Sequence, residues 1–389
     1  MPLNYCYIIR DFGARSGNIE VDDCPEFQGR AFGACCFKEL PTVAAKDFVK
    51  KYLKKQPVMR KVIYALIPCI AGSVYFFGWR SLFLVIWAAL VGFIVEYIFA
   101  RYRRDTVTEA VFVTTTLFAL VMPPTVPLHV LTIGVAFAVM FSKEIFGGFG
   151  RNIFNPAIAG RCFVYVCFPV ALTATWAPAA DGLWGALDRW TTAPTVDATT
   201  GASPMGDLKA GKLVINSQEG ASSQIPFDIR EDQRVEVTRT SILKGLLLGR
   251  ISGTMGVTSA LLILIGGVYL YYKRIASREI ILSVIITYAI LNQLLHFFGV
   301  EPVPSAWVAV LGGGFLLGAF FMATDPVSSP KKYHAKIAYG IIIACSTVVI
   351  RNFSIFNGGL MFSIMIGNMF APILDHASTA YTKAKKAKK

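Results

Sequence analysis

Apolar residues fall in runs of about 15 to 20 residues along most of the chain, and short polar segments separate these runs. A helix needs about 20 apolar residues to cross the hydrocarbon core of a bilayer, so each run predicts a membrane span. The pattern predicts an all-α integral membrane protein with about ten transmembrane helices. The runs lie at about residues 62–78, 81–100, 108–122, 127–142, 156–173, 253–272, 279–298, 305–323, 337–351 and 359–374.

The composition agrees with this pattern and speaks against an ordinary soluble enzyme. Of the 389 residues, 54% are hydrophobic and 16% are charged, and the mean hydropathy is +0.54. Soluble domains carry about 25% charged residues. No cleavable signal peptide is expected, because residues 1–56 are polar and lack a basic region followed by an apolar stretch.

The basic residues indicate topology rather than a nucleic-acid partner. The formal net charge is +14, but Lys and Arg cluster at the ends of apolar runs instead of alternating with aromatic residues. Threading ten spans from a cytoplasmic N-terminus places every cluster in the cytoplasm, as the positive-inside rule requires, so both termini are expected there. The clusters are formed by Lys50, Lys51, Lys54, Lys55, Arg60, Lys61, Arg101, Arg103, Arg104, Lys273, Arg274, Arg278, Lys331, Lys332, Lys336, Lys383, Lys385, Lys386, Lys388 and Lys389.

A long polar segment, 174–240, separates the fifth run from the sixth. It has nine acidic and six basic residues, a net charge of −3, and the same threading places it outside the cytoplasm. Five spans on each side of it predict two inverted halves. The expected organisation is a polar cytoplasmic segment 1–56, a first membrane half 57–173, the loop 174–240, a second membrane half 241–376 and a basic cytoplasmic tail 377–389.

Two apolar runs end in proline at equivalent places of the two halves. The third ends in Leu-Val-Met-Pro123-Pro124, and the eighth ends in Phe-Met-Ala-Thr-Asp325-Pro326. Broken helices at corresponding positions of inverted repeats point to a binding site near the bilayer midplane. The alternative interpretation is that each proline only ends a helix.

The outer loop contains the segment Asp197-Ala-Thr-Thr200-Gly201-Ala202-Ser203, in which small residues surround hydroxyl groups. Small residues let a bulky group approach the backbone, although such runs are also common in turns. The segment resembles the flavinylation motif of the NqrB/RnfD family, whose members belong to the sodium-translocating NADH:quinone oxidoreductase (Nqr) and to the Rnf complex. The resemblance implies covalent FMN on Ser203 through a phosphoester, at a position where that family usually has Thr.

A second segment, Gly147-Gly148-Phe-Gly150-Arg-Asn152-Ile-Phe-Asn155, joins the fourth and fifth runs and resembles the same family. Three glycines allow a flat ligand close to the backbone, and the two amides offer donors and acceptors to a flavin or quinone edge. We expect quinone or riboflavin at these five named residues. The alternatives are a helix cap with a tight turn, or a phosphate loop, whose known glycine spacings this segment does not match.

Further segments that begin at Gly249, Met322 and Asn368 match the same family, so the resemblance runs from about residue 60 to 376. It implies that electrons reach the covalent FMN from another flavoprotein subunit, pass to riboflavin among the helices, and end on ubiquinone or menaquinone while the complex exports Na+. It also implies the bacterial inner membrane as location, and other complex subunits and a flavin transferase as partners. The chain would position the flavins without supplying a catalytic side chain of its own.

Three carboxylates are candidates for an ion pathway. Acidic groups at membrane depth or at span ends mark pathways more often than surface charges do. Glu144, Asp325 and Asp375 stand at span ends on the side expected to be cytoplasmic. The alternative for each is a purely structural pairing with an arginine, a lysine or a backbone group.

Two other functions are compatible with the sequence. One is the corresponding Rnf subunit, although the chain length, the N-terminal extension and the ending Phe370-Ala-Pro-Ile-Leu-Asp375-His376 favour Nqr. The other is a redox-free channel or transporter, which two inverted halves would also suit. No metal site is expected, because the N-terminal cysteines lack a Cys-x-x-Cys pair and the histidines lack i,i+4 spacing. The sequence leaves open the choice between Na+ and H+, the quinone type, the riboflavin position and the role of residues 1–56.

Overall fold

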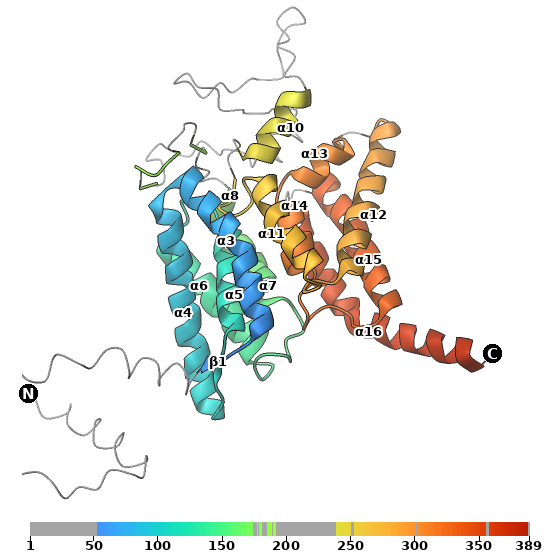
Figure 1. The fold of residues 1–389 in the computed structure, drawn as a ribbon, viewed down its shortest axis with the longest axis horizontal. Coiled ribbons are helices and arrows are strands. Elements are labelled where there is room, and N and C mark those ends of the chain that lie inside the picture. The colour runs from blue at the N-terminus through green and yellow to red at the C-terminus, as the bar shows by residue number, and fades with distance from the viewer. Residues whose placement is uncertain are drawn as a thin grey trace, which may run out of the picture. The chain divides into compact units, whose positions relative to one another are not determined.

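The chain is described from a computed structural model, and Figure 1 gives the element labels used below. All described residues belong to one unit, Lys50–Lys389. The structure describes residues 53–173, 177, 179–180, 185–188, 190–191, 239–249, 253–300, 302–354 and 358–387.

The described chain is mostly helical, and five of its helices are long and apolar enough to cross a membrane. Their apolar stretches coincide with five of the runs expected from the sequence, which supports a multi-pass membrane protein. These helices are α3 (Pro57–Phe77), α4 (Trp79–Arg103), α12 (Arg278–Phe297), α15 (Tyr333–Phe353) and α16 (Gly359–Ala387).

The other expected spans are shorter helices or interrupted ones, because proline and glycine stand inside the apolar runs. Pro169 begins a new short helix and so divides the run 156–173, which the apolar pattern alone does not divide. Ten full spans therefore stay a prediction. The elements are α5 (Ala110–Leu120), α6 (Leu128–Val139) with π-helix η1 (Met140–Glu144), α7 (Pro156–Cys167), α8 (Pro169–Thr173), α10 (Arg239–Leu248), α11 (Ala260–Tyr272), α13 (Ala306–Leu311), α14 (Phe315–Leu317) and π-helix η2 (Gly318–Met322).

A buried arginine holds the interruption between α13 and α14. Gly313 and Gly314 turn the chain with φ of +59° and +72°, which leaves carbonyl groups at the end of α13 without helical partners. Arg351, only 4% exposed, donates hydrogen bonds to the carbonyl oxygens of Ala309 (3.2 Å) and Gly312 (2.8 Å). The guanidinium thus replaces the helical bonds that the break removes.

The end of α5 is closed by backbone groups from a distant segment. Pro123 and Pro124 stop the helix and leave the carbonyl groups before them unpaired. The backbone N–H of Met255 donates to the carbonyl of Met122 at 3.0 Å, and that of Gly256 donates to Leu120 at 2.7 Å. Residues after the long loop therefore complete a helix that precedes it.

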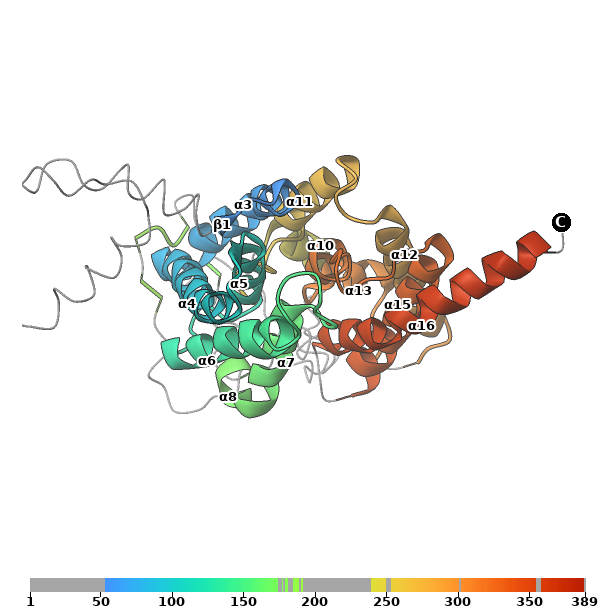
Figure 2. The ribbon, with the colours of Figure 1, turned by 90° about the horizontal axis from the view of Figure 1, so that it is seen from below.

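Two groups of helices meet through two pairs. Helices α4 to α7 pack together, as do α12, α13, α15 and α16. Across the middle, α3 packs against α11 and α7 packs against α16, and Figures 1 and 2 show both pairs side by side. A short parallel pairing of β1 (Leu53–Lys54) with β2 (Val107–Thr108) fixes the chain entering α3 beside the start of α5.

Candidate functional site

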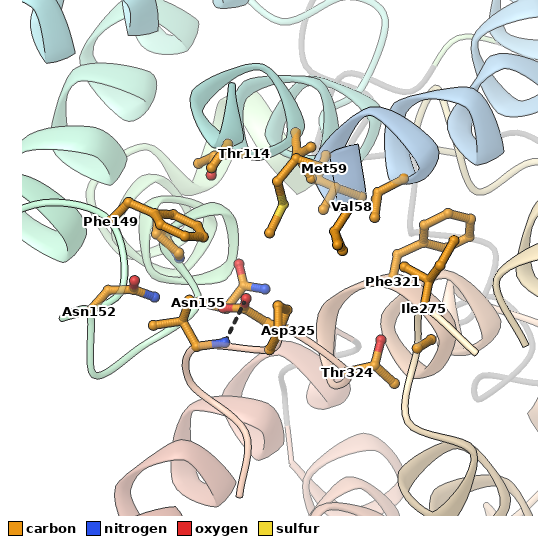
Figure 3. Close-up of a pocket in the computed structure, with 18 of the residues that line it drawn as sticks. Val58, Met59, Thr114, Phe149, Asn152, Asn155, Ile275, Phe321, Thr324 and Asp325 are labelled. Carbon is orange, nitrogen blue, oxygen red and sulfur yellow. Dashed lines mark hydrogen bonds between the residues drawn. The ribbon is translucent and has the colours of Figure 1, made fainter. Parts of the chain in front are cut away.

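A cavity lies where α3, α5 and α11 meet the two chain segments that follow η1 and η2 (Figure 3). Its walls are mainly aliphatic and aromatic, and a few polar groups converge on it, which is the usual character of a small-molecule site. The lining residues are Val58, Met59, Val62, Ala110, Val113, Thr114, Leu117, Lys143, Phe149, Asn152, Asn155, Pro156, Leu270, Ile275, Ala276, Phe321, Thr324, Asp325, Pro326 and Val327.

The cavity joins two segments that the sequence predicts as separate sites. Asn152 and Asn155 come from the expected flavin or quinone segment, and Asp325 comes from the expected ion pathway. Figure 3 shows the three side chains near one another, with Phe149 and Thr324 around the same space. The two halves of the chain thus contribute polar groups to one site.

Asn155 has a structural role at this site. Its side-chain oxygen accepts from the backbone N–H of Ala157 at 3.0 Å and so caps α7. Its amide nitrogen donates to the carbonyl of Met322 at 3.1 Å, at the end of η2. The helix-cap alternative therefore describes Asn155, and this one side chain links the two halves beside the cavity.

Asp325 follows η2 in a turn outside the helices. Its carboxylate accepts from the hydroxyl of Ser328 at 2.8 Å and from the backbone N–H of Val327 at 3.3 Å. Separation from bulk water raises the pKa of the Asp325 carboxyl, and these hydrogen bonds offset part of that rise. Thr324 donates to the carbonyl of Phe320 at 2.7 Å, so its oxygen still has lone pairs for a ligand.

Lys143 is a cavity residue that the sequence pattern did not indicate. Its ammonium group is 2.5 Å from the carboxylate of Glu96 and 2.9 Å from the hydroxyl of Thr108. Both charged side chains are almost fully buried, at 2% and 3% exposed. The signal that points to this pair is the presence of opposite charges at the second and fourth apolar runs.

The three glycines of the expected ligand segment build the turn after η1 and do not line the cavity. Gly147, Gly148 and Gly150 have φ between +92° and +100°, a region that favours glycine. The N–H of Gly147 donates to the carbonyl of Glu144, and that of Gly148 donates to Lys143, both at 3.0 Å. Their direct role is to reverse the chain so that Phe149 and Asn152 reach the cavity.

The other two expected ion-pathway carboxylates lie outside the cavity lining. Glu144 forms an ion pair with Arg103, and its second oxygen has no hydrogen-bond partner among the described residues. Asp375 accepts from the backbone N–H groups of Lys331 and Lys332, both at 2.9 Å, just before α15. The structure thus shows the structural pairing of each residue.

The segment expected to carry FMN lies outside the described residues, as do most of the loop 174–240 and of the segment 1–56. This applies to Asp197, Thr200, Gly201, Ala202 and Ser203. Within the described part of the chain, no group of three or more His, Cys, Asp or Glu residues is arranged to hold a metal ion.

A family model described as the NQR2, RnfD, RnfE family matches residues 42–383. The chain belongs to this family. The match covers nearly all of the described helices and agrees with the resemblance seen in the sequence. It also agrees with the multi-pass membrane architecture suggested by the five long apolar helices.

Curated relatives of this family member share one name, which makes each of them the NqrB subunit of a Na(+)-translocating NADH-quinone reductase. The protein of Pseudoalteromonas atlantica is 34% identical over 313 residues, which cover 78% of this chain and 68% of that protein. The protein of Azotobacter vinelandii is 33% identical, with 76% and 66% covered, and that of Neisseria meningitidis serogroup A is 34% identical, with 82% and 70% covered. The chain therefore spans about two thirds of the length of these relatives.

The glycine turn allows a comparison of two similar substitutions. A Cβ at Gly148 would lie 2.9 Å from the Arg103 guanidinium, whereas one at Gly150 would meet no atom within 4 Å. Both changes strain the backbone by about 1–2 kcal/mol, but only Gly148→Ala also disturbs the Arg103–Glu144 pair. We expect Gly148→Ala to lower the melting temperature of the purified protein and the rate of quinone reduction more than Gly150→Ala does. Equal effects of the two changes would contradict this role of Arg103.

Proposed function

We propose that this chain is the flavin-carrying membrane subunit of a Na+-translocating NADH:quinone oxidoreductase. The proposal rests chiefly on the cavity, which unites the family segment around Asn152 with the segment around Asp325. The family contains Nqr and Rnf subunits, and the relatives described above carry the Nqr name. The other subunits of that complex and a quinone are its proposed partners, and the bacterial inner membrane is its proposed location.

Two inverted five-helix halves are part of the same proposal. A two-fold axis in the membrane plane would pair the first span of one half with the first of the other, and the last with the last. The contacts of α3 with α11 and of α7 with α16 have this pattern. With both termini in the cytoplasm, the cavity lies toward the cytoplasmic face and the loop 174–240 faces outward.

The cavity suits a flat ring with a polar edge. Phe149 and Phe321 offer apolar faces, while the amide of Asn152 and the hydroxyl of Thr114 offer hydrogen bonds. Riboflavin and the head group of ubiquinone or menaquinone share this chemistry. The redox reaction belongs to the bound ring, and the chain binds it, orients it and keeps water away from it.

Replacing Asn152 tests the cavity directly. Asn155 is unsuitable because it caps α7, whereas the Asn152 amide donates to the carbonyl of its near neighbour Phe154 at 3.1 Å. We expect Asn152→Leu to raise the KM for quinone, or to weaken retention of non-covalent riboflavin, by roughly five- to tenfold, the effect of one lost hydrogen bond. Covalent flavin should be unchanged.

The matched control is Ile153→Ala, because Ile153 is the next residue, is 43% exposed and does not line the cavity. If Asn152→Leu leaves both the quinone KM and the riboflavin content at wild-type values, the cavity is not the ligand site.

Covalent FMN on Ser203, within the motif Asp197 to Ser203, is the second element of the proposal. We expect Ser203→Ala to abolish in-gel flavin fluorescence after denaturation, because the phosphoester needs a hydroxyl oxygen. Ser203→Thr, which restores the residue usual in the family, should keep the fluorescence when the flavin transferase is present. Fluorescence that survives in Ser203→Ala, or an unmodified Ser203 peptide in active complex, would refute the assignment.

An ion site at Asp325 is the third element, with Thr324 as a second oxygen ligand for Na+. We expect Asp325→Asn to raise the Na+ concentration for half-maximal turnover roughly tenfold, because a charged ligand is lost. Since burial raises the pKa of this carboxyl, protons should compete with Na+ above the ordinary carboxyl range. Acidification should therefore weaken the apparent Na+ affinity of the wild type and leave that of Asp325→Asn unchanged.

Two other carboxylates complete this experiment. Glu279→Gln is the control, because Glu279 is partly exposed and pairs with Lys336 at 3.6 Å, away from the cavity. Asp375→Asn tests the remaining candidate of the ion pathway. Wild-type Na+ dependence in Asp325→Asn and Asp375→Asn, with normal flavin content, would leave only their structural roles.

A further inference from the structure

Lys143 places a positive charge at the wall of the cavity. It lies in η1, where its side chain is almost fully buried and lines the cavity together with Phe149. Of its three N–H donors, one meets Glu96 at 2.5 Å and one meets Thr108 at 2.9 Å. The third donor is therefore available to a group inside the cavity.

The negative partner of Lys143 lies behind it. Glu96 belongs to the membrane helix α4 and does not line the cavity. One of its oxygens accepts from the backbone N–H of Thr108 at 2.8 Å and from its hydroxyl at 2.7 Å, and the other oxygen faces Lys143. The pair is thus oriented, with its cation toward the cavity and its anion away from it.

This arrangement is not explained by stability alone. Replacing a buried ion pair by apolar side chains of similar volume is often neutral or stabilising, because burial removes two charges from water. The surrounding residues are apolar enough to accept such side chains, since Ala100, Val107 and Val139 are all buried nearby in the chain. A fixed charge beside a cavity does, however, change the charge that a ligand there prefers.

The other charged groups near the cavity do not cancel this effect. Asp325 lies on the wall contributed by the second half and is held by Ser328 and Val327. Glu144, the neighbour of Lys143, forms an ion pair with Arg103, and neither residue lines the cavity. Among the described residues, Lys143 is the one cationic side chain that lines it.

We propose that the ammonium group of Lys143 stabilises negative charge on a carbonyl oxygen of the ring bound in this cavity. The chemical class of ligand is a redox ring that bears carbonyl groups, which includes quinones and isoalloxazines. Each electron comes from NADH through the flavins of the complex, and the added charge rests partly on the carbonyl oxygen. Lys143 keeps its proton and donates a hydrogen bond, so no bond forms or breaks. This inference rests on the proposed function and assigns Lys143 as a further binding residue of its site.

The first test measures charge preference without any turnover. A hydroxynaphthoquinone, which is an anion at neutral pH, and its neutral methyl ether are titrated into the purified complex. We expect the wild type to favour the anion, and Lys143→Met combined with Glu96→Gln to lose that preference at least tenfold. The double variant removes both charges, so it leaves no unpaired buried charge to unfold the protein.

The second test covers the flavin as the source of the same chemistry. In quinone-free complex, the midpoint potential of non-covalent riboflavin should fall in the double variant. A tenfold loss of preference for the reduced ring corresponds to about 59 mV for a one-electron couple. Glu96→Gln alone keeps the cation without its counter-charge and should shift the potential in the opposite direction, which a merely structural role would not do.

The control is Arg60→Met combined with Glu109→Gln, a neighbouring ion pair that does not line the cavity. It should change neither the anion preference nor the potential. If ligands bind to the double variant of Lys143 and Glu96 with unchanged preference and potential, the inference about Lys143 is wrong. If neither quinone nor riboflavin binds in a way that Asn152→Leu affects, the proposed function of the cavity fails instead.

Discussion

The architecture depends on one constraint, which is that backbone groups freed by broken helices need hydrogen-bond partners from the protein itself. Hydrocarbon offers none, and each unpaired buried group costs several kcal/mol. Arg351 meets this need at Gly312, and the backbone of Gly256 meets it at Leu120. Asn155 does the same at Met322. Each partner comes from another element, so the breaks are also the points at which distant parts of the chain are joined.

The same constraint explains where the cavity lies. At the end of α5, backbone N–H groups approach the freed carbonyls directly, and Gly256 lies against Leu120. At the end of η2 the partner is a side-chain amide, which holds the chain farther away and leaves space beside Asp325. The buried pair of Lys143 and Glu96 then borders that space. Packing, charge and ligand binding are therefore connected through one junction of the two halves.

Periodicity predicted the long helices well, because a run of apolar residues is sufficient to specify a membrane helix. It could not show that Pro169 starts a new helix or that Gly314 interrupts another, since hydropathy is insensitive to backbone geometry. The family resemblance indicated the segment of the site. It did not separate Asn152, which lines the cavity, from Gly148, which shapes the turn, because that distinction depends on contacts between distant residues. Lys143 was missed for the same reason.

The most direct test of the central claim is photoaffinity labelling of the assembled complex with azidoquinone and, separately, with an azido derivative of riboflavin. The account predicts that at least one of these probes labels peptides that contain Met59, Phe149 or Phe321, and that excess unlabelled ligand prevents the labelling. If neither probe labels these peptides while the complex remains active, the cavity is not a redox-ligand site and the account is wrong.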